Sequence, residues 1–136
     1  MPLRRKAREY ALQMLFQWEM SPQEPARIET GFWKGARAEP HTRRFANQLF
    51  EGAVAEAGVI DELLGKHAQN WRLDRMSAID RNILRLAVYE LRSVPDTPPK
   101  VVINEALELA KTFSSPEAVP FINGILDAIL KSSESK

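Results

Sequence analysis

Apolar side chains recur at intervals of three and four residues along most of the chain, which is the period of a helix with one buried face. The first such series runs to about Met20 and ends before Pro22, because proline cannot continue the hydrogen-bond ladder of a helix. Leu12 and Phe16 widen its stripe toward a second side, so we expect this helix to contact more than one neighbour. The stripe itself consists of Ala7, Ala11, Met14, Leu15 and Trp18.

Similar series follow along the rest of the chain, and no stretch alternates with the period of two that is typical of a strand. A connector is expected before the fifth of these helices, with Trp71 as its buried anchor. The sequence therefore predicts an all-α fold of six or seven helices in a single domain over residues 1–136. After the first helix, the expected ranges are residues 27–34, 42–57, 59–66, 77–91, 99–113 and 115–131.

The helix expected after Ser77 is the candidate for the centre of the core. Ser77 is followed three residues later by Asp80, which is the spacing of an N-terminal cap. Asp80 and Glu90 fall on or beside the apolar face, and a buried carboxylate must be paired or hydrogen-bonded. Arg81 and Arg85 project elsewhere, so any partner must come from another element.

Glycine and serine positions predict further local features. Gly58 is expected to break a helix, whereas Gly52 and Gly124 indicate close contact with a neighbouring helix. Ser114 and Glu117 have the spacing of a capping box at the start of the last helix.

Four cations, Arg4, Arg5, Lys6 and Arg8, crowd the first two turns of the first helix. Cations at a helix N-terminus oppose the macrodipole at a cost of about 0.3–1 kcal/mol each. A cluster kept against that cost indicates an anionic partner, for which phosphate is the common choice. The alternative interpretation is a solvated basic helix end that aids solubility only.

The rest of the composition mainly excludes classes of protein. The net charge of +1 says little about partners, and the absence of cysteine excludes disulfides and thiolate metal sites and suits a reducing cytoplasm. No apolar run is long enough for a membrane span, and Glu9 and Gln17 interrupt what could otherwise be a signal peptide. No phosphate loop, zinc spacing or nucleophile elbow is present, so neither an enzyme nor a cofactor nor a metal site is predicted.

Two other functions remain open on the residues alone. A helix-turn-helix DNA binder would need polar and basic side chains on the outer side of the helix after Ser77. Such side chains are expected there, but the connector before this helix is longer than the three- to four-residue turn of that motif. A helical protein–protein scaffold with an incidental basic end is the second alternative. The outward-facing residues expected on this helix are Arg81, Asn82, Arg85, Tyr89 and Arg92.

Four segments, in order, resemble the NusB family of bacterial transcription antitermination factors. They lie within residues 4–17, 80–91, 101–111 and 121–127, the third of which reads VVINEALELAK. Together they make the resemblance extend along nearly the whole chain. Residues 21–41 match little, and Phe16 stands where the family often has tyrosine.

The resemblance implies two small helical bundles packed together and a non-catalytic adaptor function. Such proteins bind the single-stranded boxA element of ribosomal RNA leader transcripts together with NusE, which is also a small-subunit ribosomal protein. The complex helps RNA polymerase read through terminators during rRNA transcription. A homodimer also occurs among such proteins, and the sequence leaves that state open.

The resemblance also assigns roles to individual residues. Glu117 lies where the family meets its protein partner. Phe121 stacks a base or packs in the core, and both interpretations stay open. The implied RNA-binding residues are Arg4, Arg5, Lys6, Arg8, Gln13, Phe121 and Asn123.

Overall fold

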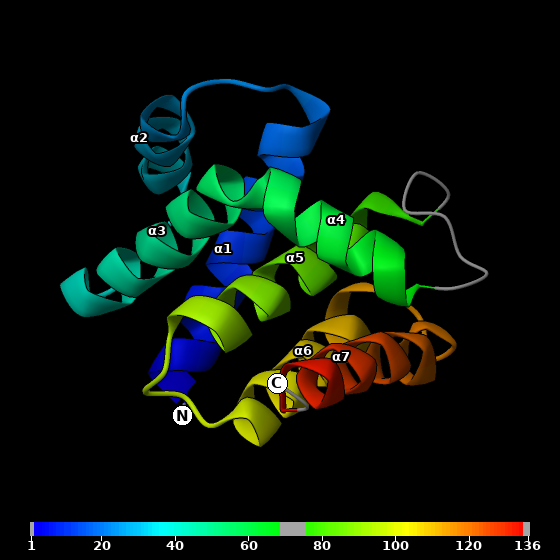
Figure 1. Ribbon diagram of the computed structural model, residues 1–136. Helices are drawn as coiled ribbons and strands as arrows, with labels where there is room; N and C mark the ends of the chain where they lie inside the picture. The colour runs from blue at the N-terminus through cyan, green and yellow to red at the C-terminus, as the bar shows by residue number, and fades with distance from the viewer. Residues whose placement is uncertain (1, 69–75, 135–136) are drawn as a thin grey trace.

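The computed structural model describes residues 2–68 and 76–134, and within these ranges it contains seven α-helices and no strand (Figure 1). The prediction of an all-α fold is therefore confirmed. The expected anchor Trp71 lies outside the described residues. In chain order the helices are α1 (Pro2–Met20), α2 (Pro25–Gly35), α3 (Pro40–Ala55), α4 (Ala57–His67), α5 (Ala78–Ser93), α6 (Pro99–Phe113) and α7 (Ala118–Glu134).

Helix α5 lies at the centre of the molecule and packs against α1, α3, α4, α6 and α7 (Figure 1). Helix α2 packs on α1 and α3. Every residue of α5 from Asn82 to Glu90 is buried, as expected for the central helix. Helix α1 contacts α2, α3 and α5, which confirms that its apolar surface serves more than one neighbour.

The helix termini follow the sequence signals in part. The backbone N–H of Asp80 donates to the Ser77 hydroxyl at 3.1 Å, so the predicted cap of α5 is present. The capping box at Ser114 and Glu117 is wrong, because α7 begins only at Ala118 and the Ser114 hydroxyl donates to the Asp80 carboxylate instead. Asp80 thereby ties the connection between α6 and α7 to the start of α5.

The glycines divide into one close contact and several open positions. A Cβ placed on Gly52 would overlap the Tyr89 ring, so α3 and α5 approach closely there as expected. A Cβ on Gly124 would meet nothing within 4 Å, so the expected close contact at Gly124 is wrong. Gly58 lies inside α4, and the break between α3 and α4 falls at Glu56 instead.

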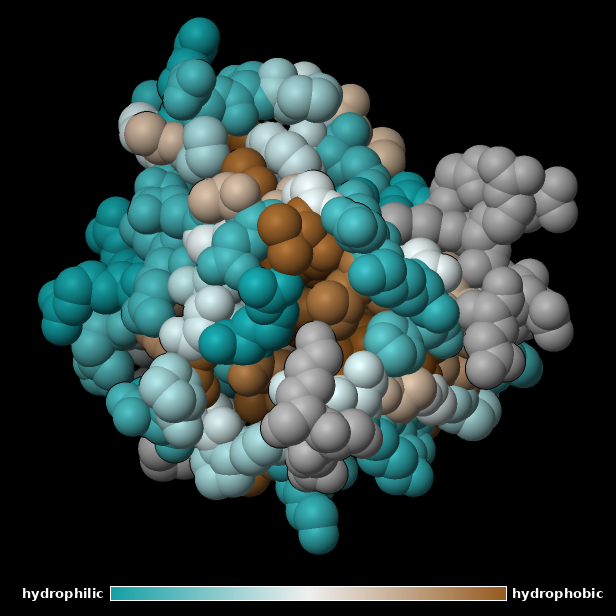
Figure 2. Space-filling model, viewed as in Figure 1, coloured by the Kyte–Doolittle hydropathy of each residue, from teal (hydrophilic) through white to brown (hydrophobic). Residues whose placement is uncertain are grey.

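Hydrophilic side chains cover most of the face shown in Figure 2, and apolar side chains gather in a hollow near its middle. None of the helices in the described part of the chain is long and apolar enough to cross a membrane.

Candidate nucleic-acid interface

Arg4 is held by groups from two other elements. Its Nη1 donates to the Thr97 hydroxyl at 3.0 Å, and its guanidinium carbon lies 4.6 Å from the centre of the Phe45 ring. Thr97 is buried in the loop between α5 and α6, and Phe45 belongs to α3. The first turn of α1 is thus fixed on both sides while the Arg4 side chain remains partly exposed.

Arg5 forms a two-pronged ion pair with Glu105 of α6. Its Nε and Nη2 donate to the two carboxylate oxygens at 3.0 and 2.8 Å. The Glu105 side chain is 9% exposed and that of Arg5 is 51% exposed, so the guanidinium keeps an open edge toward solvent. The hydrogen bond from Arg5 outweighs the desolvation of Glu105 and lowers the pKa of that carboxyl. The pair therefore orients the arginine without burying it.

Arg8 is buried, with 3% of its surface exposed, and it pairs with Glu90 of α5. The Nε–Oε1 and Nη2–Oε2 distances are 2.8 and 2.6 Å, and Nη1 lies 3.6 Å from an oxygen of Glu105. The expectation that Glu90 finds its partner on another helix is confirmed. Contact between Arg8 and RNA stays a prediction, because in this geometry its charge is matched inside the protein.

A hollow of about 200 Å³ lies beside these arginines, between α1 and the loop that precedes α6. Arg8 borders this hollow although its side chain is only 4% exposed. The hollow is lined by Arg4, Arg8, Asp96, Thr97, Pro98 and Val101.

Lys6 and Gln13 of α1 are exposed, as Arg5 is. The Lys6 ammonium is 3.4 Å from a carboxylate oxygen of Glu9 and 5.2 Å from the centre of the Tyr10 ring. Exposed ion pairs of this kind contribute about 0–1 kcal/mol, so Lys6 can exchange Glu9 for another anion at little cost. Gln13 lies farther along the helix and borders an apolar groove.

The remaining predicted residues lie on the last helix and its approach. Phe121 is half-buried and packs against the core, whereas Asn123 is exposed. Glu117 is exposed on the connection between α6 and α7. Phe121 remains partly exposed, so it can both pack on the core and offer surface to a base. Its stacking on a base stays a prediction.

Sequence reasoning missed Glu105 and Thr97 as supports of the cluster. Glu105 is buried beside Val102 and Leu109 in α6. These residues are three before and four after it, so helical spacing already placed Glu105 on the apolar face. A carboxylate at such a position must be paired or hydrogen-bonded, and the structure supplies Arg5 of α1 as its partner.

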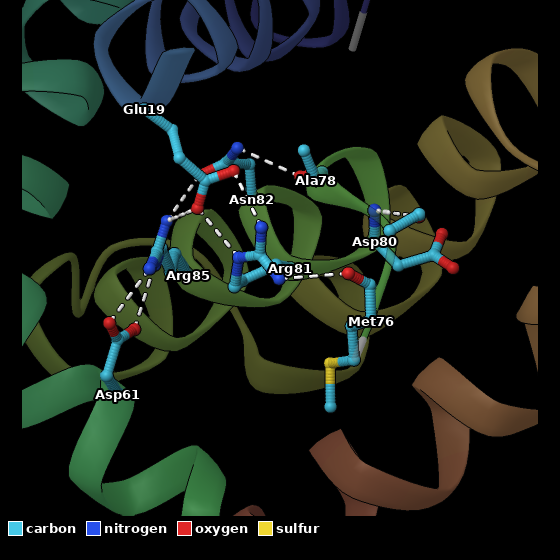
Figure 3. Close-up of polar contacts among 9 residues, drawn as sticks. Glu19, Asp61, Met76, Ala78, Asp80, Arg81, Asn82 and Arg85 are labelled. Carbon is cyan, nitrogen blue, oxygen red and sulfur yellow. Dashed lines mark hydrogen bonds and ion pairs between the residues drawn. The ribbon is translucent and has the colours of Figure 1, made fainter. Parts of the chain in front are cut away.

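Arg81 and Arg85 do not form an outward-facing basic row, and this part of the DNA-binding hypothesis is wrong. Arg81 donates to both oxygens of Glu19 at 2.7 and 2.9 Å, and its Nη1 donates to the Met76 carbonyl (Figure 3). Arg85 donates to both oxygens of Asp61 at 2.8 Å and to Glu19 at 2.7 Å.

This cluster joins three helices, since Glu19 comes from α1, Asp61 from α4 and the arginines from α5 (Figure 3). Burial disfavours the charged form of Glu19, but the hydrogen bonds from Arg81 and Arg85 outweigh it and lower the pKa of its carboxyl. Asn82, Arg85 and Tyr89 are buried rather than exposed on this helix. The partners of these arginines, Glu19 and Asp61, lie on other helices, so the spacing of residues within α5 could not predict them.

An apolar groove of about 440 Å³ runs along α1 next to the cation cluster. Phe16 is 37% exposed and Met20 is 57% exposed, which is unusual for side chains of this size. The apolar surface of the first helix is thus only partly covered at Phe16. The groove is lined by Leu12, Gln13, Phe16, Gln17, Met20, Phe32, Ile79 and Phe113. No group of three metal-ligating side chains that could hold an ion occurs among the described residues.

Comparisons with known proteins agree along nearly the whole chain. The model of the NusB family matches residues 5–131. The transcription antitermination protein NusB of Koribacter versatilis (strain Ellin345) is 49% identical over 134 residues, which cover 98% of this chain and 92% of the relative.

Two solved structures share the fold. NusB of T. maritima superimposes with a TM-score of 0.84 at 35% identity, covering 94% of this chain and 90% of that one. A crystal structure of the antitermination factors NusB and NusE in complex with dsRNA contains a chain that superimposes with a TM-score of 0.86 at 29% identity. In that case 97% of this chain and 98% of the other are covered.

Proposed function

Because the chain belongs to the NusB family, we propose that it is a transcription antitermination factor that binds boxA RNA of ribosomal RNA leader transcripts together with NusE. It acts as a non-catalytic adaptor that helps RNA polymerase read through terminators. The observation that carries this proposal is the cation cluster at the start of α1, which a set of buried partners holds in place. Residues 1–136 are proposed to form one domain, since α5 packs against α1, α3, α4, α6 and α7.

The three outer cations Arg4, Arg5 and Lys6 are the proposed phosphate contacts. A guanidinium carries five N–H donors, and Glu105 uses only part of the Arg5 set. Because Glu105 fixes the fork of Arg5 before RNA arrives, less rotamer entropy is lost on binding. Arg8 braces this arrangement by tying α1 to Glu90 of α5. Its direct contact with RNA is proposed to run through the neighbouring hollow.

The cluster alone gives weak, salt-sensitive binding. With about four phosphate contacts to a single strand, the slope of log affinity against log salt is about −3. Raising the salt from about 50 to about 200 mM then costs about fifty-fold in affinity. Binding in the cell therefore needs additional contacts from a partner protein.

We propose that NusE docks on the apolar groove that contains Phe16 and Met20. This groove lies on the same helix as the cations, so one helix can present RNA contacts at its start and protein contacts farther along. Glu117 follows Phe113, which lines the groove, by four residues and is exposed. Its proposed role is a charged contact at the rim of the same interface.

The RNA is proposed to be single-stranded, with Gln13 and Asn123 as polar contacts and Phe121 stacking a base. A stacked base contributes about 1–3 kcal/mol. The complex of the related NusB and NusE contains dsRNA, so the test includes a duplex RNA as well. The proposed compartment is the cytoplasm, where nascent leader transcripts are made. A homodimer of this chain is the alternative assembly to its complex with NusE.

The test is terminator read-through by RNA polymerase on a leader template with boxA or with scrambled boxA. We expect this protein and NusE together to raise read-through only on the boxA template. Equal read-through on both templates contradicts the proposal and favours a protein–protein scaffold. A preference for duplex DNA in a parallel binding assay favours the DNA-binding alternative.

A further inference from the structure

A second groove, of about 450 Å³, lies between α4, α7 and the C-terminal end of α5. No residue of α1 contributes to it, so it is separate from the proposed RNA and NusE surfaces. In Figures 1 and 2, α4 and the end of α7 face the reader, and apolar side chains are visible in the hollow near them. Its lining consists of Leu63, Lys66, His67, Leu91, Arg92, Ile129, Leu130, Ser132 and Ser133.

The floor of this groove is aliphatic and its rim is basic. Leu63, Leu91 and Leu130 are only half-buried, so their side chains remain partly open to water. Lys66 and Arg92 are exposed on the rim, and no carboxylate belongs to the lining as far as the described residues go. The groove therefore combines an apolar floor with positive charge at its rim.

The rim cations differ from the arginines that border the core. Arg5, Arg8, Arg81 and Arg85 are each matched by a carboxylate at hydrogen-bond distance. Lys66 and Arg92 form no ion pair within the part of the chain that the structure describes. Both lie in the last turn of their helices, where a cation complements the macrodipole. The macrodipole explains why cations are found at these two positions. It does not explain why the leucines of the groove floor remain partly exposed.

We propose that this groove is a docking site for an acidic amphipathic helix of another protein. Apolar side chains of such a helix, spaced i, i+3, i+4 and i+7, pack on the leucine floor. Its carboxylates pair with Lys66 and Arg92, which complement them in charge. RNA is the less suitable occupant, because among the described lining residues there is no phenylalanine, tyrosine or tryptophan ring for a base, and the imidazole of His67 is half-buried.

The first experiment titrates the 15N-labelled full chain with a synthetic peptide of about four helical turns. The peptide carries leucines at the spacing given above and glutamates elsewhere, and a matched peptide has lysine in place of each glutamate. We expect amide shifts confined to α4, α7 and the end of α5, with binding of the lysine peptide at least about tenfold weaker. Absence of shifts, or equal binding of the two peptides, overturns the proposal.

A charge-reversal pair then tests the rim. The variant Lys66→Glu/Arg92→Glu is expected to bind the glutamate peptide at least about tenfold more weakly. The matched control Arg27→Glu/Lys34→Glu makes the same change in net charge on exposed positions of α2 and is expected to bind as the wild type does. Equal losses in both variants indicate a general charge effect and overturn the proposal.

A third titration separates this site from the proposed function. Single-stranded boxA RNA is expected to shift amides of α1 and to leave α4 unchanged. If RNA shifts the groove residues and the glutamate peptide does not, the groove belongs to an RNA path and the docking proposal is wrong. Failure of RNA binding at α1 leaves the peptide result unaffected, so the two proposals fail independently.

Discussion

Arg8 and Glu90 stand 82 positions apart in the chain and form a buried two-pronged ion pair, with Nη2 and Oε2 2.6 Å apart. The pair joins the basic start of α1 to the central helix α5. The side chains are 4% and 1% exposed, so neither charge can be solvated if the other is removed. The placement of the cation cluster thus depends on a contact in the core.

The first prediction concerns this pair. Replacing its acid, Glu90→Leu, leaves the buried Arg8 charge without its hydrogen-bonded carboxylate and with only Glu105 nearby, at 3.6 Å. The change is expected to lower the free energy of unfolding by about 3–5 kcal/mol. The double variant Arg8→Met/Glu90→Leu is expected to recover most of this loss. Denaturant unfolding measures both values.

The matched control is Asp127→Asn, which breaks the exposed pair between Asp127 and Lys131. Its expected cost is below about 1 kcal/mol. A cost for Glu90→Leu as small as that of Asp127→Asn contradicts the structural role given to the buried pair.

The second prediction compares two glycines. Gly52→Ala drives a methyl group into the Tyr89 ring and is expected to destabilise the protein by about 1–3 kcal/mol. Gly124→Ala meets open space in a helix and is expected to stabilise it by about 0.5–1 kcal/mol. Thermal unfolding checks the opposite signs, and shifts of the same sign refute the packing described at these positions.

These glycines show what could be predicted from the sequence and what could not. Helical spacing predicted all seven helices, and the local signal at Ser77 predicted its cap. The same spacing cannot say which glycine faces another helix, because that depends on the crossing of α3 and α5. Gly124 lies in helix α7, where glycine is less favourable than alanine, but no other helix approaches it closely.

The candidate site shows the same limit. The cluster of cations was visible in the sequence, and so was the need of Glu90 for a partner from elsewhere. The supports Thr97 and Glu105 come from residues about a hundred positions away and required the tertiary structure. Arg81 and Arg85 were placed on an outer face because the acids that cover them belong to other helices.

The third prediction concerns pH. Burial and the neighbouring Glu51 carboxyl raise the pKa of Glu29 from its ordinary value of 4.5 to about 8. One oxygen of Glu29 is buried without a hydrogen-bond partner in the part of the chain described, which agrees with a carboxyl that stays protonated. The folded state therefore holds a proton that the unfolded state releases above 4.5.

The resulting stabilisation is complete below pH 4.5 and is lost as the pH rises through about 8. After allowance for solvent screening, we expect the free energy of unfolding to fall by about 1 kcal/mol over that range. Glu51→Gln is expected to reduce the fall, whereas the exposed Glu62→Gln leaves it as in the wild type. Identical pH profiles for the wild type and Glu51→Gln contradict this account.

The fourth prediction concerns the partner surface. Phe16→Gln removes an exposed aromatic side chain from the apolar groove and is expected to weaken NusE binding at least about tenfold. Because Phe16 is 37% exposed, the change also removes some buried apolar area and is expected to lower the free energy of unfolding by about 1–2 kcal/mol. Calorimetric titration with NusE measures the affinity. Val59→Gln alters an exposed apolar residue on α4 and serves as the control, and an equal loss in both variants rules out the Phe16 groove as the docking site.

The most direct test of the account is fluorescence anisotropy of labelled boxA RNA, with scrambled and duplex RNA alongside, in the presence and absence of NusE. The variant Arg4→Ala/Arg5→Ala/Lys6→Ala removes the outer cations and keeps the buried Arg8 pair. We predict tight, NusE-enhanced binding of boxA by the wild type, a loss of at least about tenfold in the variant, and a salt slope reduced by about two. Equal affinity of the wild type and the variant for boxA would contradict the central claim that this end of α1 binds RNA.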